Sequence, residues 1–202
     1  MFDARLLPLT RRILRPTAKW LHETNMPADH ITLGGFAIGL LACIAAALGA
    51  FGWALLGLAL NRLADGLDGE VARIAGPSDR GAFLDIALDF VFYALFPVAF
   101  ALHDPATNAL PAAVLVGTFV GAGSSFLAFS IIAEKRGISS QAYPTKGIYY
   151  LGGLCEGAET IAVLAAFCLF PSAFPALAWG FAAACAITTA SRLLAGWKVF
   201  AD

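Results

Sequence analysis

Four aspartates are the side chains in this sequence best suited to chemistry. Asp65 and Asp68 stand in one mostly apolar stretch, and Asp85 and Asp89 stand in the next. Ionised carboxylates in such surroundings repel one another and lose hydration, so bound cations are the expected compensation. Carboxylate oxygens suit Mg²⁺, Mn²⁺ or Ca²⁺, and the stretch from Asp65 to Asp89 contains no His or Cys that would suggest zinc. The sequence therefore predicts a divalent metal site.

The spacing of the aspartates predicts that they face one another. Each stretch fits one face of a helix, with Asp65, Asp68 and Ala72 at i, i+3 and i+7, and Gly81, Asp85 and Asp89 at every fourth position. Two helices joined by a short turn are antiparallel neighbours, so these faces would meet. The structural alternative is a neutral aspartate, or one paired with a cation such as Arg62. Four aspartates at these spacings favour the metal site.

The same stretch resembles the signature of the CDP-alcohol phosphotransferases, also called CDP-alcohol phosphatidyltransferases. That signature reads D-x-x-D-G-x-x-A-R followed by G-x-x-x-D-x-x-x-D, and its fixed letters stand here as Asp65, Asp68, Gly69, Ala72, Arg73, Gly81, Asp85 and Asp89. Seven residues separate Arg73 from Gly81, one fewer than in many members. This difference predicts a shorter turn between the two helices.

The resemblance implies a transferase of phospholipid biosynthesis that moves a phosphatidyl group from a CDP-alcohol, such as CDP-diacylglycerol, to a hydroxyl acceptor and releases CMP. It implies two Mg²⁺ or Mn²⁺ ions held by Asp65, Asp68, Asp85 and Asp89, with Asp89 also acting as the general base. The implied donor-binding residues are Thr32, Asp65, Gly69, Ala72, Arg73 and Gly81. The resemblance further implies a homodimer.

Residues outside the signature are candidates for the acceptor half of the site. Lys146 would bind an acceptor phosphate, with ordinary charge flanking of a membrane helix as the alternative. Glu156 and Glu159 lie one turn apart in an apolar stretch. They would bind acceptor hydroxyls or an amine, or pair with Arg192. For Thr32 the alternative to a phosphate contact is capping of the next helix.

The elements that must position these residues are membrane helices. The chain has 202 residues, of which 59% are hydrophobic and 13% charged, and its mean hydropathy is +0.77, outside the usual range of soluble domains. About 20 apolar residues span a bilayer core. Gly and Pro breaks leave six such segments, near residues 31–50, 53–75, 81–102, 109–133, 147–170 and 175–199. We expect an all-α integral membrane protein with a single domain, residues 1–202, built on a six-helix bundle.

The distribution of Lys and Arg predicts how the bundle is oriented. Residues 1–24 mix five Lys and Arg residues with apolar ones at helical spacing, which predicts an interfacial amphipathic helix, although Pro8 and Pro16 also allow two short helices. In the six-helix plan the other loop cations fall on the same side. The positive-inside rule then places both termini and the aspartates toward the cytoplasm, here of a bacterial inner membrane.

A divalent cation transporter or channel is the rival hypothesis from a different class of protein. Its carboxylates would line an ion path and would need polar groups continuing across the membrane. Beyond Asp65 and Asp89 the two helices are largely apolar. The partners that the family resemblance implies are a CDP-alcohol and a small alcohol. We also expect contact with the lipid bilayer and none with nucleic acid.

Overall fold

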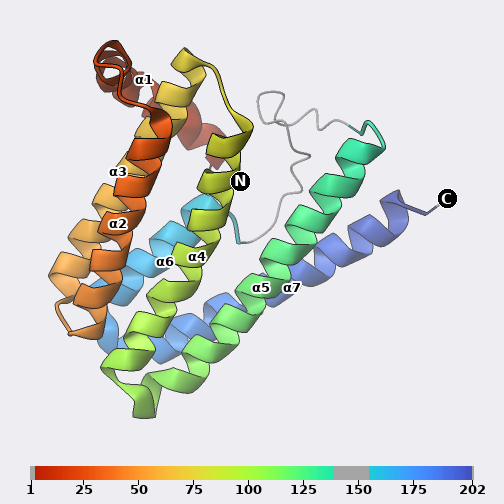
Figure 1. The fold of residues 1–202 in the computed structure, drawn as a ribbon. Coiled ribbons are helices and arrows are strands. Elements are labelled where there is room, and N and C mark those ends of the chain that lie inside the picture. Colours follow the sequence, from red (N-terminus) through yellow and green to blue (C-terminus); the bar gives the residue numbers. More distant parts are fainter. Residues whose placement is uncertain (1–2, 139–154, 202) are drawn as a thin grey trace.

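The computed structural model describes residues 3–138 and 155–201, and these residues form helices joined by short turns, without a β-strand. The helices are α1 (Asp3–Glu23), α2 (Ala28–Ala47), α3 (Phe51–Ala75), α4 (Asp79–His103), α5 (Pro105–Lys135), α6 (Gly157–Leu169) and α7 (Phe174–Val199), with a 3₁₀ turn at Pro171–Ala173 (Figure 1). The prediction of an all-α protein is confirmed.

Four segments in the described part of the chain are long and apolar enough to cross a membrane. They are α2, α4, α5 and the segment Pro171–Val199, which contains α7. Helix α3 has 25 residues, but it carries five charged side chains from its middle onward, Arg62, Asp65, Asp68, Glu70 and Arg73. Helix α6 has 13 residues. The described residues thus contain four candidate spans.

The start of α6 corrects one predicted boundary. The sequence predicted a helix from about residue 147, whereas Glu156 has extended backbone and α6 begins at Gly157. The carbonyl of Glu156 accepts the first helical hydrogen bond, from the Thr160 amide. Cys155 and Glu156, which the predicted helix included, therefore precede the observed one. Residues 147–154 lie outside the described residues.

Helix α1 is one continuous helix, so the two-helix alternative is wrong. It packs against α3, where a Cβ atom added at Gly66 would lie 2.7 Å from Cδ1 of Leu14. Ile13 and Trp20 remain exposed. In Figure 1, α1 lies at the same end of the bundle as the α3–α4 turn.

A cluster of buried phenylalanines holds the opposite end of the bundle together. Phe100 of α4 stacks on Phe174 of α7, with ring centroids 4.9 Å apart, and meets Phe167 of α6 edge-on at 5.7 Å. Phe92 and Phe96 continue this row along α4, and all five rings are fully buried. Close-packed aromatic rings of this kind resist displacement, so they fix α4 against α6 and α7.

Two glycines of α2 allow both α3 and α4 to pack closely against α2. A Cβ atom at Gly35 would lie 2.7 Å from Cβ of Ala64 on α3, and one at Gly39 would lie 2.9 Å from the Phe92 ring on α4 and 3.0 Å from the Asn61 amide nitrogen. No larger residue fits these positions without movement. The small face of α2 therefore sets the spacing between the two helices that carry the aspartates.

Candidate functional site

Three of the four signature aspartates converge. Asp65 and Asp68 on α3 and Asp85 on α4 each offer a carboxylate oxygen, and these oxygens all lie within 4.8 Å of one another. Asp68 is 5% exposed, and its Oδ2 has no hydrogen-bond partner. A buried carboxylate oxygen without a donor is costly unless a cation lies beside it. The three oxygens therefore fit a divalent ion.

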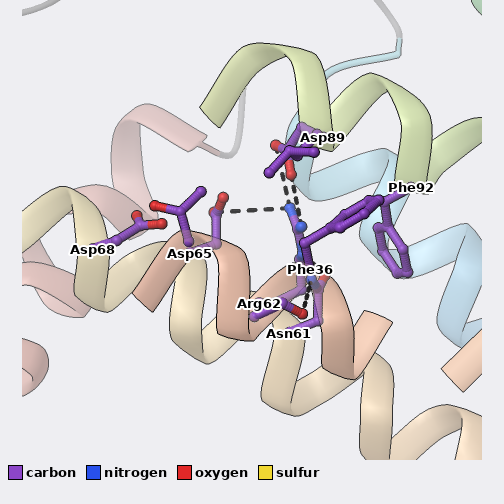
Figure 2. Close-up of a pocket in the computed structure, with 10 residues that line it drawn as sticks. Phe36, Asn61, Arg62, Asp65, Asp68, Asp89 and Phe92 are labelled. Carbon is purple, nitrogen blue, oxygen red and sulfur yellow. Dashed lines mark hydrogen bonds and ion pairs between the residues drawn. The ribbon is translucent and has the colours of Figure 1, made fainter. Parts of the chain in front are cut away.

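Asp89, the fourth aspartate, is ion-paired with Arg62. Nη2 of Arg62 donates to Oδ1 of Asp89 at 2.7 Å, and Nη1 lies 3.4 Å from Oδ2. Nη1 also lies 3.7 Å from Oδ2 of Asp65. Figure 2 shows Asp65 and Asp89 reaching the guanidinium from α3 and α4. The hydroxyl of Tyr93 accepts from Nη1 at 2.8 Å and lies 3.4 Å from Asp89 Oδ2.

A small cavity lies between α2, α3 and α4 at this point. Its volume is about 20 Å³, and its polar lining includes Thr32, Arg62, Asp65, Asp68 and Asp89. A space of this size holds about one water molecule or one ion. The cavity joins the Arg62–Asp89 pair to two members of the three-aspartate group.

Thr32 lies beside the aspartates and does not cap a helix. Its hydroxyl donates to the carbonyl of Ala28 at 3.1 Å, and its side chain lines the same small cavity as Asp68. Helix α2 begins at Ala28 without a side-chain cap, and Asp29 pairs with Arg80 of α4 at 2.6 Å. The capping alternative is therefore wrong, because the helix starts five residues earlier than that role requires. A nucleotide contact by Thr32 stays a prediction.

The remaining signature residues lie outside the lining of the small cavity. The Arg73 guanidinium lies 3.5 Å from the position of a Cβ atom at Gly69 and pairs with Glu70 at 2.5 Å. The Gly81 amide donates to Oγ of Ser78 at 3.1 Å, which caps α4. These residues and Ala72 stand nearer the α3–α4 turn than the cavity. Their contact with a nucleotide stays a prediction.

A larger cavity of about 180 Å³ lies next to the Asp89 site. Aromatic rings form much of its wall, and its polar residues include Glu156, Thr160 and Arg192. Tyr93 lines this cavity and also contacts Asp89. Of the predicted acceptor residues, Glu156 therefore reaches a cavity, and Lys146 lies outside the described residues.

Glu159 and Arg192 differ in their relation to the larger cavity. Glu159 is absent from its lining, and its Oε2 is buried without a hydrogen-bond partner. Arg192 is 7% exposed and donates to the carbonyl of Ala122 at 3.0 Å. Its guanidinium lies over the Phe126 ring, 5.4 Å from the centroid. The predicted pairing of the glutamates with Arg192 stays a prediction.

Sequence reasoning gave Arg62 only the alternative role of pairing with an aspartate and overlooked Tyr93. Both continue the helical spacings of the signature: Arg62 lies three residues before Asp65, and Tyr93 lies four residues after Asp89. Extending each spacing by one step would have placed both side chains on the site face.

Comparison with known proteins identifies the family. The sequence model of the CDP-alcohol phosphatidyltransferase family matches residues 25–194. The chain belongs to this family. Inner membrane protein YnjF of Escherichia coli (strain K12) is 47% identical over 197 residues, which cover 98% of this chain and 96% of YnjF. Phosphatidylcholine synthase of Mesorhizobium japonicum is 34% identical over 141 residues, covering 64% of this chain and 46% of that enzyme.

Solved structures support the fold. Phosphatidylinositol phosphate synthase PgsA1 of Mycobacterium tuberculosis with CDP-DAG bound has a TM-score of 0.74 at 23% identity, over 92% of this chain and 94% of PgsA1. The same enzyme in complex with manganese and citrate has a TM-score of 0.71 at 22% identity, over 91% of this chain and 88% of that one. The chain thus shares the fold of this synthase.

Proposed function

We propose that this protein transfers a phosphatidyl group from CDP-diacylglycerol to the hydroxyl group of a small alcohol and releases CMP. The observation that carries the proposal is the group formed by Asp65, Asp68 and Asp85 at signature positions, with a buried Asp68 oxygen that lacks a hydrogen-bond donor. Membership of the family supports the reaction type. The CDP-DAG bound to PgsA1 supports the choice of donor.

Mg²⁺ or Mn²⁺ is the proposed cofactor, as two ions held by the four signature aspartates. The described ligands are all carboxylate oxygens, the type that these ions prefer. When bound, such ions neutralise the donor pyrophosphate and the charge that develops on the departing CMP.

Asp89 is the proposed general base. Its carboxylate would take the proton of the acceptor hydroxyl as the acceptor oxygen forms a bond to the phosphatidyl phosphorus and the bond from that phosphorus to CMP breaks. Arg62 and Tyr93 both contact the carboxylate. The donor nucleotide would lie along Thr32, Asp65, Gly69, Ala72, Arg73 and Gly81.

The larger cavity is the proposed acceptor site. It is separated from Asp89 by the side chain of Tyr93, which contacts both. Its volume of about 180 Å³ suits a small alcohol, and Glu156 and Arg192 offer hydrogen-bonding groups of both charges. Lys146 and Glu159 remain proposed acceptor residues on the basis of sequence.

The proposed membrane arrangement adds α3 and the α6 segment to the four candidate spans, giving six. In it α1 lies at the interface, both termini and the aspartates face the cytoplasm, and residues 1–202 form one domain. The name of YnjF, an inner membrane protein, supports a bacterial inner-membrane location. A homodimer is proposed from the family resemblance.

The transporter hypothesis is not favoured. Beyond Asn61 and Tyr93, toward the turn at Asp104, the buried side chains of α3 and α4 are apolar. They include Leu58, Phe96 and Phe100, each 2% exposed or less. A hydrated ion path through these packed rings would need them to move apart.

An assay of the purified full-length protein tests the proposed function. CDP-diacylglycerol is supplied with a panel of small alcohols, CMP release is measured, and the lipid product is identified by mass spectrometry. We expect CMP release with Mg²⁺ or Mn²⁺ and none in a chelator. Metal uptake by proteoliposomes without CMP release from any CDP-alcohol would contradict the proposal and favour a transporter.

Two variants of one helix make this assay specific. Asp85→Asn removes a member of the three-aspartate group and should lower the rate by about 100-fold or more. Asp79→Asn removes an exposed carboxylate at the start of α4, outside that group, and should leave the rate within about twofold. Equal rates in the two variants would show that the aspartate group is not the site.

A further inference from the structure

Arg62 is a buried cation that forms an ion pair with Asp89. Its side chain is 12% exposed, and its Nε donates to Oδ1 of Asn61 at 2.8 Å. The Asn61 amide in turn donates to the carbonyl of Gly35 at 2.9 Å. The guanidinium also lies over the rings of Phe92 and Tyr93, 5.3 Å from each centroid. These contacts fix one orientation of Arg62.

The four aspartates are therefore not equivalent toward a cation. Asp65, Asp68 and Asp85 form a group whose oxygens lie within 4.8 Å of one another. Asp89 stands outside this group, and each of its oxygens faces an Arg62 nitrogen, at 2.7 and 3.4 Å. The cavity that adjoins both has a volume of only about 20 Å³, room for about one ion.

A second divalent ion on Asp89 would meet a charge that cannot be removed by deprotonation. Guanidinium stays protonated in proteins, so it competes with a metal ion for the same carboxylate oxygens. At separations of a few ångströms in a partly buried site, repulsion between a dication and this cation is substantial. An ion at Asp89 therefore requires Arg62 to leave that carboxylate.

We propose that Arg62 is a built-in counter-cation of Asp89 that controls metal loading. One ion binds to Asp65, Asp68 and Asp85 with Arg62 in place, and a second binds at Asp89 only as Arg62 is displaced. Arg62 is thus a positioning residue for the proposed base. The inference rests on the proposed function for the identity of the ions as Mg²⁺ or Mn²⁺.

Mn²⁺ titration of the purified full-length protein, followed by the electron paramagnetic resonance signal of free Mn²⁺ without substrate, tests this inference. The wild type should bind one ion tightly and a second about tenfold or more weakly. Arg62→Gln keeps a hydrogen-bonding group but removes the charge, and should bring the two affinities within about threefold. Arg62→Lys keeps the charge and should retain two separate affinities. Two equal affinities in the wild type, or identical isotherms for wild type and Arg62→Gln, would overturn it.

A second variant keeps the test decisive if Arg62→Gln does not fold. Asp89→Asn with Arg62 intact should leave the affinity of the first ion within about twofold and abolish the second. A loss of about tenfold or more in the first affinity would make Asp89 a ligand of the first ion and overturn the inference. Absence of Mn²⁺ binding in every form would instead overturn the metal assignment of the proposed function, and this inference with it.

Discussion

Asp89 is contacted by the guanidinium of Arg62 and by the hydroxyl of Tyr93, which are themselves hydrogen-bonded. A base must have a fixed orientation and a free lone pair for the acceptor proton. The pair with Arg62 supplies this orientation until a second ion displaces the guanidinium. Tyr93 contacts the carboxylate and also lines the larger cavity. At the scale of single residues, the chemistry of the site thus depends on how these three side chains share hydrogen bonds.

Asp89→Asn should abolish transfer while the protein stays folded. The amide is nearly the same size as the carboxylate, but it cannot accept the acceptor proton, and we expect the rate of CMP release to fall by about 100- to 10,000-fold. Thermal unfolding in detergent, measured beside CMP release, separates lost chemistry from lost structure. Full activity in this variant would exclude Asp89 as the base.

The sequence predicted the grouping of aspartates but not the contacts of Asp89. Asp65, Asp68 and Asp85 were predictable because carboxylates in apolar stretches at helical spacing have few alternatives to a shared face. The Arg62–Asp89 pair depends on side-chain rotamers and on the separation of α3 and α4. That separation is set by packing against α2, which no local pattern in α3 or α4 contains.

At the scale of elements, the small face of α2, which contains Gly35 and Gly39, determines how closely α2 packs against α3 and α4. Gly35 contacts Ala64 of α3, and its carbonyl accepts from Asn61, which holds Arg62. A chain of contacts therefore runs from the backbone of α2 to Asp89. A change in the distance between α2 and α3 should reach the Asp89 carboxylate through these two side chains.

Gly35→Ala should destabilise the protein and impair transfer. The added Cβ would lie 2.7 Å from Cβ of Ala64, so α2 and α3 must separate, at a cost of about 1–3 kcal/mol. Gly34→Ala is the matched control, because a Cβ there meets nothing within 4 Å and alanine favours the helix by about 0.5–1 kcal/mol. Thermal unfolding and CMP release of both variants check this, and an equal response would contradict the packing argument.

Element boundaries show where sequence patterns stop being informative. Thr32 was a reasonable cap because it precedes an apolar run, yet α2 begins at Ala28, where Pro27 supplies the extended backbone that precedes a helix. The later start of α6 at Gly157 is likewise not marked by hydropathy, because apolar residues stand on both sides of Glu156. Hydropathy locates such segments, but backbone geometry decides their ends.

At the scale of the whole molecule, chemistry and packing occupy opposite ends. The aspartates and α1 lie toward the end that carries the α3–α4 turn, and the phenylalanine cluster around Phe100 lies toward the α4–α5 turn (Figure 1). Such a division lets a rigid aromatic cluster support the polar site that would admit the proposed nucleotide donor and acceptor. The two ends also differ in their content of Lys and Arg, which predicts the end that faces the cytoplasm.

Cysteine labelling in bacterial spheroplasts should show that the phenylalanine end faces away from the cytoplasm. Ala106 is exposed beside the α4–α5 turn, and Lys198 is exposed near the end of α7. Because Lys and Arg concentrate at the aspartate end, the positive-inside rule places that end in the cytoplasm. A membrane-impermeant maleimide should therefore label Ala106→Cys in intact spheroplasts and Lys198→Cys only after permeabilisation, with the parent chain as the control for its native cysteines. The reverse pattern would invert the orientation and place the proposed site on the outer face.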